Sequence, residues 1–571
     1  MNQLNARPGL GAMRAIHERA TWRGMARGVM TLATCGRCIC TFLLAGCVAQ
    51  TFDSAGMPTD SPTGAGGPWP SAGSRLLPSE VAKMAVYSDW RNGTAWLHGR
   101  NFPVAEGSLS YGPPLHRETK FAVLPAAMTP DEVSAVLGLL KPQNRRRTFE
   151  RAPDSVDAMP TEELNLYAED DIFYHNGEMV GPLVQLMRPI EDRLTAFVRH
   201  RYPEVCNRNP ERACRPCYSL VRRYLPGERR RHGIHRDGQA IVSVVTSLSD
   251  YGSEYSGGLF VAAADPHGRK VLALRKGDAV VHQYDLLHGV DVADESALRN
   301  EGSTPPGERW SWILWYKDSA TCEQRGHEWS RDCASAGDML CQYNMGWRLH
   351  LDPHMSEPEK SAGRERYMSA AAKQGFGEAM FQLARTYLGK RDLHGAVDLL
   401  RRAMAAGDVD APFQLAQLTL LGLVPRGPHQ SDATLRLRFE AALVSGGTTN
   451  HAPSVGAMRE AVELFEVAAK AGTSVFRGAE FAQYNLGVAY LYGYGVERSA
   501  RLASEWFRKC GLPEGMVALA VQANATGHEA SARVWQNRAM ILGFEERSRK
   551  ENRDFALFQL HSNWPEGPPR W

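Results

Sequence analysis

Between Tyr218 and Tyr316 the apolar residues come in short runs that Gly, Pro, Asp and Ser separate. Runs of this kind, broken by turn residues, are typical of β-strands. Several short strands at close spacing predict a sandwich or a jelly roll, that is, a double-stranded β-helix. We expect strands at Ser219 to Tyr224, Ala240 to Leu248, Leu259 to Ala263, Val271 to Leu274, Ala279 to His282 and Trp310 to Tyr316.

One strand and two helices are predicted on the N-terminal side of this β-like stretch. Phe121 to Leu124 is a short apolar run, which predicts a strand. The sequence Thr129-Pro-Asp-Glu132 is a capping box with Pro at the first helical position, so a helix should begin there and run to about Leu140. We expect a second helix from Gly181 to His200.

After Asp318 the pattern becomes helical and repetitive. The sequence of residues 341 to 346 returns at 482 to 487 with the same Gln-Tyr-Asn core, and copies start near 341, 379, 411 and 482. A degraded unit precedes the last of these, and a further one lies near 515. Spacings of about 32 to 38 residues match tetratricopeptide-type helix-turn-helix repeats. Each unit ends in an Ala-rich helix closed by Gly, at Gly375, Gly407 and Gly472.

Residues 486 to 496, followed by Trp506 and Phe507, resemble Sel-one-like repeats, and the resemblance covers roughly 330 to 545. A stacked helical array presents a concave surface that usually binds protein and carries no bond-making chemistry of its own. We therefore expect a protein partner on this array, and we read its Ala, Leu and Tyr positions as core. Residues 546 to 571 form a C-terminal tail.

The N-terminal end reads as a targeting segment over residues 1 to 50. Residues 1 to 37 hold six Arg and one acidic residue, and the apolar run of residues 38 to 49 follows. This run is too short for a comfortable membrane span, so we expect a secretory signal, the endoplasmic reticulum or secretory pathway, and no transmembrane span in the mature chain. An organelle transit peptide, or a lipoprotein box at Leu44-Ala-Gly-Cys47, remains an alternative. Residues 51 to 114 are a linker and an unassigned stretch.

Length, charge and the placement of Arg and Cys add further constraints. The 571 residues suffice for about three or four domains, and a net charge of +3 gives no argument for nucleic acid. The cluster Arg229 to Arg231 is either a solvated rim or a contact for an acidic or phosphorylated substrate. Cys206, Cys214 and Cys217 lack a fourth ligand for zinc, so a disulfide is expected if the chain is exported.

Candidate chemistry lies within the β-like stretch. His235 and Asp237 are two residues apart before an apolar run, so in an extended segment their side chains share a face. His288 would complete two imidazoles and one carboxylate, a set that holds ferrous iron and leaves positions open. A His-x-Asp triplet alone is weak evidence in a chain with 18 His, and a second one at His350 we read as accidental.

Other motifs follow the triplet in a fixed order. They are Gly257-Gly-Leu-Phe260, Arg275-Lys-Gly-Asp-Ala-Val-Val281, Leu287-His-Gly-Val290 and Gly307-Glu-Arg-Trp-Ser311. This order resembles the prolyl 4-hydroxylase branch of the iron(II) and 2-oxoglutarate-dependent dioxygenases, over roughly residues 115 to 320. The resemblance implies a jelly-roll domain that hydroxylates a side chain of a protein or peptide, most simply at the 4-position of proline.

The resemblance also implies a role for each matching residue. His235, Asp237 and His288 would bind Fe(II), with 2-oxoglutarate and dioxygen as cosubstrates and ascorbate as a candidate reductant. Arg309 would grip the distal carboxylate of 2-oxoglutarate, which agrees with the two-pronged way in which a buried guanidinium binds a carboxylate. Tyr224 and Ser311 are expected to contribute to the same cosubstrate site.

Three departures and two alternatives accompany this interpretation. The insert from Asp291 to Pro306 lengthens the gap before Arg309, Leu259-Phe260 replaces the family's usual Glu-Thr, and His232 is expected at the rim. An AlkB-like nucleic-acid dealkylase would carry an Arg six residues after Arg309, where this chain has Trp315. A non-catalytic scaffold, in which these His are ordinary polar residues of a β-sandwich, would require that the three ligands do not converge.

Overall fold

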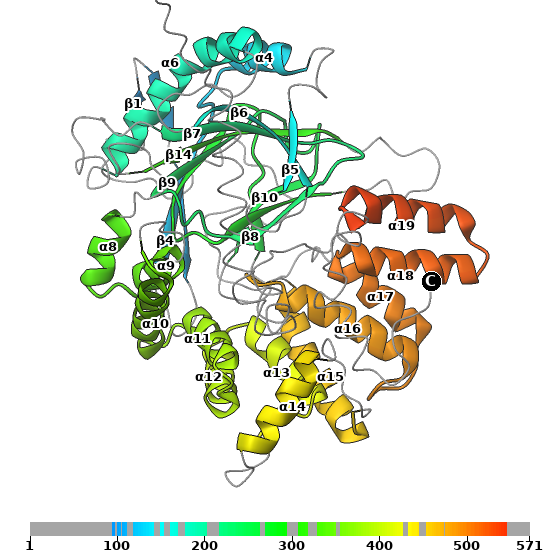
Figure 1. Cartoon of the computed structure of the whole chain (residues 1–571). Helices are drawn as coiled ribbons and strands as arrows, with labels where there is room; N and C mark the ends of the chain where they lie inside the picture. The colour runs from blue at the N-terminus through cyan, green and yellow to red at the C-terminus, as the bar shows by residue number, and fades with distance from the viewer. Residues whose placement is uncertain are drawn as a thin grey trace, which may run out of the picture.

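The structure is a computed structural model, and two antiparallel sheets and a helical array make up most of the part that it describes (Figure 1). It describes residues 94–97, 100–103, 105–110, 118–141, 149–153, 160–168, 177–202, 216–262, 269–293, 307–317, 328–349, 355–425, 432–444, 453–472 and 474–544. The predicted targeting segment and C-terminal tail lie outside these residues. Among the described helices, none is long and apolar enough to cross a membrane.

In the described part of the chain, the larger sheet has eight strands and the smaller has four, and all their pairings are antiparallel. In spatial order the larger sheet contains β3 (Ala105–Ser110), β4 (Glu118–Leu124), β12 (Ala279–Gln283), β9 (Val242–Ser247), β14 (Arg309–Tyr316), β7 (Pro216–Tyr224), β6 (Pro160–Ala168) and β5 (Glu150–Pro153). The smaller contains β11 (Arg269–Val271), β10 (Gly257–Ala262), β13 (His288–Val292) and β8 (Arg231–His235). A separate hairpin joins β1 (Thr94–Leu97) to β2 (Arg100–Pro103).

Each face of the larger sheet has its own apolar cover. Because side chains alternate along a strand, Val242 and Val244 of β9 point to one face and Val245 to the other. The first face packs on helices α4 (Pro130–Leu140) and α6 (Gly177–Arg201). The second face packs on the smaller sheet. Strands β9 and β14 are therefore buried on both sides, which explains their nearly continuous apolar sequence.

The sequence predictions for this region are largely confirmed at the level of elements. Antiparallel sheets are present, and the Thr129–Glu132 capping box begins α4 as expected, with Glu132 N donating to Thr129 Oγ1 at 3.2 Å. The prediction of a strand from Val271 to Leu274 is wrong, because β11 ends at Val271 and Leu274 N donates to Leu272 O in a turn. The jelly-roll closure of the two sheets stays a prediction.

The helical C-terminal region is confirmed as well. Its helices pack mainly on their neighbours in sequence, and Gly375, Gly407 and Gly472 follow three of them with positive φ of 94°, 85° and 73°. A residue without Cβ reaches this conformation most easily, which explains the Gly at the end of each unit. The helices are α8 (Glu328–Ser335), α9 (Met339–Arg348), α10 (Glu357–Lys373), α11 (Gly377–Gly389), α12 (Leu393–Ala405), α13 (Asp410–Leu420), α14 (Asp432–Val444), α15 (Val455–Lys470), α16 (Gly478–Tyr492), α17 (Ala500–Cys510), α18 (Pro513–Ala525) and α19 (Glu529–Ile541).

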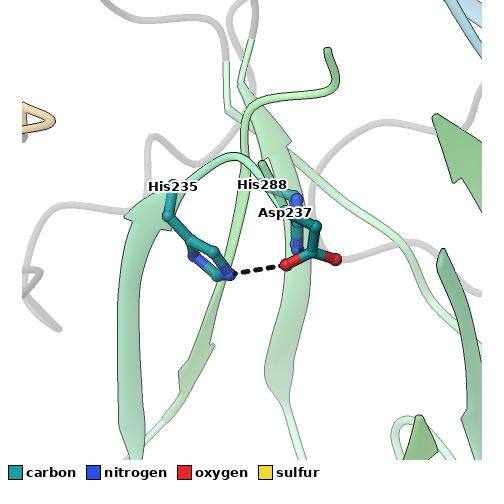
Figure 2. Close-up of side chains that lie close together, drawn as sticks. All are labelled: His235, Asp237 and His288. Atoms are coloured by element: carbon teal, nitrogen blue, oxygen red, sulfur yellow. Dashed lines mark ion pairs between the residues drawn. The ribbon is translucent and has the colours of Figure 1, made fainter. Parts of the chain in front are cut away.

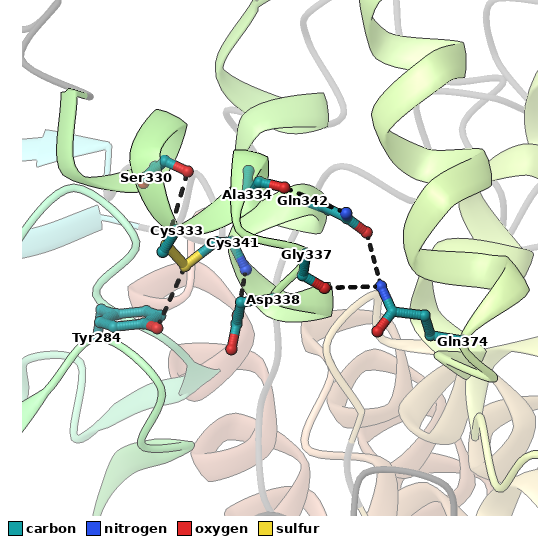
Figure 3. The surroundings of a disulfide bond; sticks show 9 residues. All are labelled: Tyr284, Ser330, Cys333, Ala334, Gly337, Asp338, Cys341, Gln342 and Gln374. Atoms are coloured by element: carbon teal, nitrogen blue, oxygen red, sulfur yellow. Dashed lines mark hydrogen bonds between the residues drawn. A yellow bond between two sulfur atoms is a disulfide. The ribbon is translucent and has the colours of Figure 1, made fainter.

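The array and the sheets share one continuous apolar core. That core includes Trp312 of β14 and Phe197 of α6 together with Leu340 and Met345 of α9. A disulfide that no sequence signal predicted joins Cys333 of α8 to Cys341 of α9 (Figure 3). The first helices of the array are thus packed on the β region and are not merely linked to it through the chain.

Candidate functional site

The structure brings His235, Asp237 and His288 together at one end of the smaller sheet (Figure 2). His235 ends β8 and His288 begins the neighbouring strand β13, where the two residues are paired in register. Asp237 follows in the turn after β8, and its Oδ1 lies 3.4 Å from His235 Nε2. Its Oδ2 lies 3.7 Å from His288 Nε2. One ligand atom from each residue lies within 4.8 Å of the others, so all three can reach a single ion.

Backbone carbonyls orient both imidazoles. His235 Nδ1 lies 2.7 Å from Gly233 O, and His288 Nδ1 lies 3.1 Å from Leu286 O. A carbonyl oxygen can only accept, so each Nδ1 carries the proton and donates it. In the neutral form of each ring the lone pair is then on Nε2, which is the atom that faces Asp237 in both residues. Second-layer hydrogen bonds of this type fix ring orientation in metal sites.

Asp237 is held by two donors from the larger sheet. Ser243 Oγ of β9 and Trp315 Nε1 of β14 both donate to Asp237 Oδ2, the second over 3.2 Å. Val242 and Leu314 point to the face of the larger sheet that packs on the helices. Because side chains alternate along a strand, the next residues, Ser243 and Trp315, point to the inner face, which packs on the smaller sheet. Oδ1 accepts neither of these two bonds and lies 3.4 Å from His235 Nε2, so the carboxylate can offer this oxygen to an ion.

The charge state of this cluster suits a divalent cation. Burial by itself would raise the pKa of Asp237, but His288, His235 and His282 around it hold that pKa well below its usual range. Burial lowers the pKa of His288 well below its usual value, which favours a neutral imidazole. One carboxylate with two imidazoles is the donor set that non-haem iron(II) sites use, with coordination positions left open.

Arg309 lies at the start of β14 and is fully buried. Its guanidinium lies between two rings, 5.3 Å from the centroid of Tyr224 and 5.8 Å from that of Tyr255. Nη1 donates to Ser311 Oγ over 3.4 Å, whereas Nε and Nη2 make no hydrogen bond to any described residue. A buried cation with unused donors is unfavourable unless an acceptor joins it. The carboxylate of a bound molecule would fit that need.

The two groups open onto the same pocket between the sheets. Its lining includes the three candidate ligands, Arg309, Tyr224 and Ser311, and in addition Arg222, His232, Arg236, Gln239, Val245, Leu259, Val290, Ile313 and Trp315. All six residues predicted from the sequence therefore line one cavity. A molecule with a carboxylate at one end and oxygen donors at the other could reach the guanidinium and the His-Asp-His group at once.

Two sequence interpretations nearby need correction. His232 is buried, at 5% exposure, and packs edge-on against His235 at 4.5 Å between ring centroids, so it does not lie at the rim. The Arg229 to Arg231 cluster is not a solvated rim, because Arg229 and Arg230 are only 4% and 6% exposed; its contact with an acidic or phosphorylated substrate stays a prediction. Arg230 donates to the carbonyls of Gly307 and Ala293, and Arg231 Nε lies 3.0 Å from Asp291 Oδ1. Arg230 and Arg231 thus tie the start of β8 to the end of β13 and to Gly307.

Sequence reasoning missed several residues of the site. For Trp315 the sequence offers only the absence of the Arg that an AlkB-like protein has at this position, and Ser243 is one polar residue within a predicted strand. Both lie on the inner face of their strands, and the alternation of side chains along β9 and β14 was the signal that could have identified them. His282 of β12 was missed as well. It is buried, with its ring 4.5 Å from that of His288 and its pKa lowered by burial.

Some predicted features lie outside the described residues. These are most of the insert before Arg309, the second His-x-Asp triplet at His350, and Cys206 and Cys214. Cys217 is described and is disulfide-bonded, so the expectation of a disulfide in that loop holds for this residue.

No protein-family model and no curated protein matches the chain. Similar solved structures include an oxidoreductase of the 2OG-Fe(II) oxygenase family from Burkholderia pseudomallei, at 17% identity, 35% of this chain, 86% of that one and a TM-score of 0.26. A prolyl-4-hydroxylase from Pseudomonas putida is 18% identical over 34% of this chain and 91% of that one, with a TM-score of 0.21. A Sel1 repeat protein from Oxalobacter formigenes is 17% identical over 38% of this chain and 81% of that one, with a TM-score of 0.28. With TM-scores this low, the side chains alone carry the functional argument.

Proposed function

We propose that this protein is an iron(II)- and 2-oxoglutarate-dependent dioxygenase of the prolyl 4-hydroxylase type, with a jelly-roll catalytic domain. One observation carries the proposal: a convergent His-Asp-His group and a fully buried arginine with unused donors line the same pocket. The motif order from His235 to Ser311, which resembles that of the prolyl 4-hydroxylases, supports the same conclusion from the sequence.

Each residue then has a task. His235 Nε2, Asp237 Oδ1 and His288 Nε2 would hold the metal, with Ser243 and Trp315 fixing the carboxylate. When bound, iron(II) would supply dioxygen activation, so that one oxygen atom goes into succinate and the other hydroxylates the substrate as carbon dioxide leaves. Arg309 would bind the distal carboxylate of 2-oxoglutarate, while Tyr224 and Tyr255 exclude water from that end of the pocket.

The substrate is proposed to be a protein or peptide, most simply at proline, and the helical array is proposed to bind a protein partner. A stacked helical array supports such a role because its surface is extended. The disulfide at Cys333 and Cys341 and the disulfide-bonded Cys217 support an oxidising compartment such as the secretory pathway. Ascorbate as a reductant belongs to the same proposal.

The two alternatives agree less well with the geometry of the site. An AlkB-like dealkylase would have Arg where Trp315 donates its indole N–H to Asp237. A scaffold without catalysis required ligands that do not converge, whereas the three ligand atoms lie within 4.8 Å of one another.

Turnover of 2-oxoglutarate tests the proposal directly. Full-length protein with Fe(II), 2-oxoglutarate and dioxygen should form succinate slowly without substrate, and faster with a proline-containing peptide that gains one oxygen atom by mass spectrometry. Asp237→Ala should abolish succinate formation. His394→Ala, which changes a histidine of α12 in the array, is the matched control and should have no effect. A folded wild-type protein without iron-dependent succinate formation would disprove the assignment.

A further inference from the structure

Arg236 stands between two candidate ligands in the sequence, yet its side chain extends to the helical array. Its Nη1 lies 2.9 Å from both carboxylate oxygens of Glu378 on α11. The guanidinium also lies over the ring of Phe376, 5.9 Å from its centroid. The two charged side chains are only 7% and 14% exposed. Leaving one partner of such a buried pair alone is strongly unfavourable, so the contact holds both segments in place.

A second contact supports the same turn from α9. A Cβ added at Gly238 would lie 3.6 Å from Asn344 Oδ1 and 3.9 Å from Arg348 Nη2, so this helix packs closely beside the residue that follows Asp237. The turn that carries two of the three candidate ligands is thus bordered by α9 and α11.

The segment before His288, the third candidate ligand, also contacts α9. Tyr284 OH lies 3.3 Å from Cys341 Sγ, and the disulfide from Cys341 to Cys333 fixes the position of that sulfur (Figure 3). Tyr284 is four residues before His288 and belongs to the core that sheets and array share. Both loops that bring ligands to the metal site therefore contact the first repeats.

The part of the array that Arg236 contacts is rich in carboxylates. Glu378 lies near Asp408, a buried residue at the end of the next repeat, since a Cβ at the adjacent Gly377 would lie 3.0 Å from Asp408 Cβ. Burial, together with the carboxylates of Asp410 and Glu378, raises the pKa of Asp408 well above its usual range. Arg236 brings a positive charge to this part of the array.

We propose that the first repeats are part of the active site's supporting structure, and that Glu378 is a positioning residue: by holding Arg236, it fixes the turn from His235 to Asp237. This inference rests on the proposed function, because it gives Glu378 a role toward the metal. Arg236 also lines the pocket. A protein bound to the array near Glu378 would therefore act on the wall of the catalytic pocket and would not merely be brought close to it.

Point variants of the full chain test this, because deleting the array would expose the shared core. Glu378→Gln should weaken Co(II) binding roughly tenfold, the lower end of the range for lost second-layer partners. In the metal-free protein, backbone amides of residues 236 to 240 should exchange hydrogen faster. Glu365→Gln is the matched control, since Glu365 on α10 pairs with Lys390 inside the array. It should change neither quantity.

A double-mutant cycle isolates the contact. Arg236→Gln also removes the contact with the Phe376 ring, so its effect should be at least that of Glu378→Gln. The double variant should be no worse than Arg236→Gln alone, because both single changes remove the same ion pair. If Glu378→Gln does not fold, Arg236→Gln alone tests the same contact.

The failures are distinguishable. Wild-type protein that binds Co(II), with Arg236→Gln and Glu378→Gln unchanged in affinity and exchange, would overturn the inference and leave the proposed function intact. Wild-type protein that binds no Co(II) through the His-Asp-His group would overturn both.

Discussion

The pocket between the sheets and the junction of α12 and α13 both bury charged side chains, but the buried groups that we compare differ in how many of their polar atoms make hydrogen bonds. In the array, Asp410 is 2% exposed, and both its oxygens accept hydrogen bonds, from Ser474 Oγ, from Gly478 N at 2.7 Å and from Phe476 N at 3.1 Å. In the pocket, Arg309 is equally buried, and two of its nitrogens make no hydrogen bond to any described residue.

This difference separates a structural use of buried charge from a binding use. A carboxylate of which both oxygens accept hydrogen bonds ties segments together, here residues 474 to 478 to the start of α13. A cation with unused donors in an otherwise well-packed site is prepared for a group that the chain does not itself provide. Burial alone would have put both residues in the same class. The following variants should behave differently in the two regions.

The largest effect is expected at the metal site. His288→Ala removes a ligand, so Co(II) affinity should fall by more than the roughly 10–100-fold that follows loss of an outer-layer partner. The thermal unfolding of the metal-free variant should stay cooperative. Calorimetric titration measures the affinity, and unchanged Co(II) binding would mean that the three residues do not form the site.

Arg309→Ala should be the next largest. Loss of one partner of a buried charge pair corresponds to about 2–5 kcal/mol, so the affinity for 2-oxoglutarate should fall about thirtyfold or more. Co(II) binding should persist, because Arg309 is no metal ligand. Arg402→Ala, an exposed arginine on α12, controls for lost charge. A normal 2-oxoglutarate affinity in Arg309→Ala, with loss in Arg299→Ala, would place the cosubstrate cation in the insert instead.

Asp410→Asn should affect stability and not ligand binding. The amide presents one N–H₂ group where the carboxylate accepted, so a buried donor of residues 474 to 478 faces another donor. The free energy of unfolding should drop by about 1–3 kcal/mol. Asp398→Asn on the exposed surface of α12 is the control. If the folded Asp410→Asn protein loses affinity for Co(II) or 2-oxoglutarate, the contrast between the two regions fails.

The smallest effect concerns pH. Burial raises the pKa of Asp410 to about 6. The folded state therefore holds this proton more tightly than the unfolded state, and wild-type stability falls as pH rises from about 4 through 6. The amide of the Asp410→Asn variant has no such proton, so the stability gap between wild type and variant should narrow by on the order of 1 kcal/mol between about pH 4.5 and 7. Denaturant unfolding at both pH values measures this, and a gap that widens with pH would contradict it.

Local pattern explains what could be read from the sequence. The apolar run of β14 and the capping box at Thr129 predicted their elements because burial on two faces and a helix start each impose a residue pattern. The strands β8 and β13 were not predicted, because Arg-His-Gly-Ile-His and His-Gly-Val-Asp-Val carry polar residues for the site in place of an apolar alternation.

Long-range contacts explain what could not be read. The pairing of Arg236 with Glu378 joins residues 142 positions apart. Arg236 occupies the variable position of the His-x-Asp triplet, so the motif does not specify what its side chain contacts. Trp315 lies on a predicted strand, yet its bond to Asp237 depends on how two sheets face each other. The ligand residues could be named because a metal restricts residue types, whereas their supports could be drawn from many side chains.

The place of β14 in the sheet has a consequence for how the chain is made. Among the strands that the structure describes, it is the last of the two sheets in sequence, and it lies between β9 and β7, which are neighbours only through it. A ribosome that has not yet released residues 309 to 316 therefore leaves both strands with unpaired edges. The nascent chain must stay protected from aggregation until those residues emerge, and the same strand delivers Arg309 and Trp315, so neither end of the pocket can be complete before then.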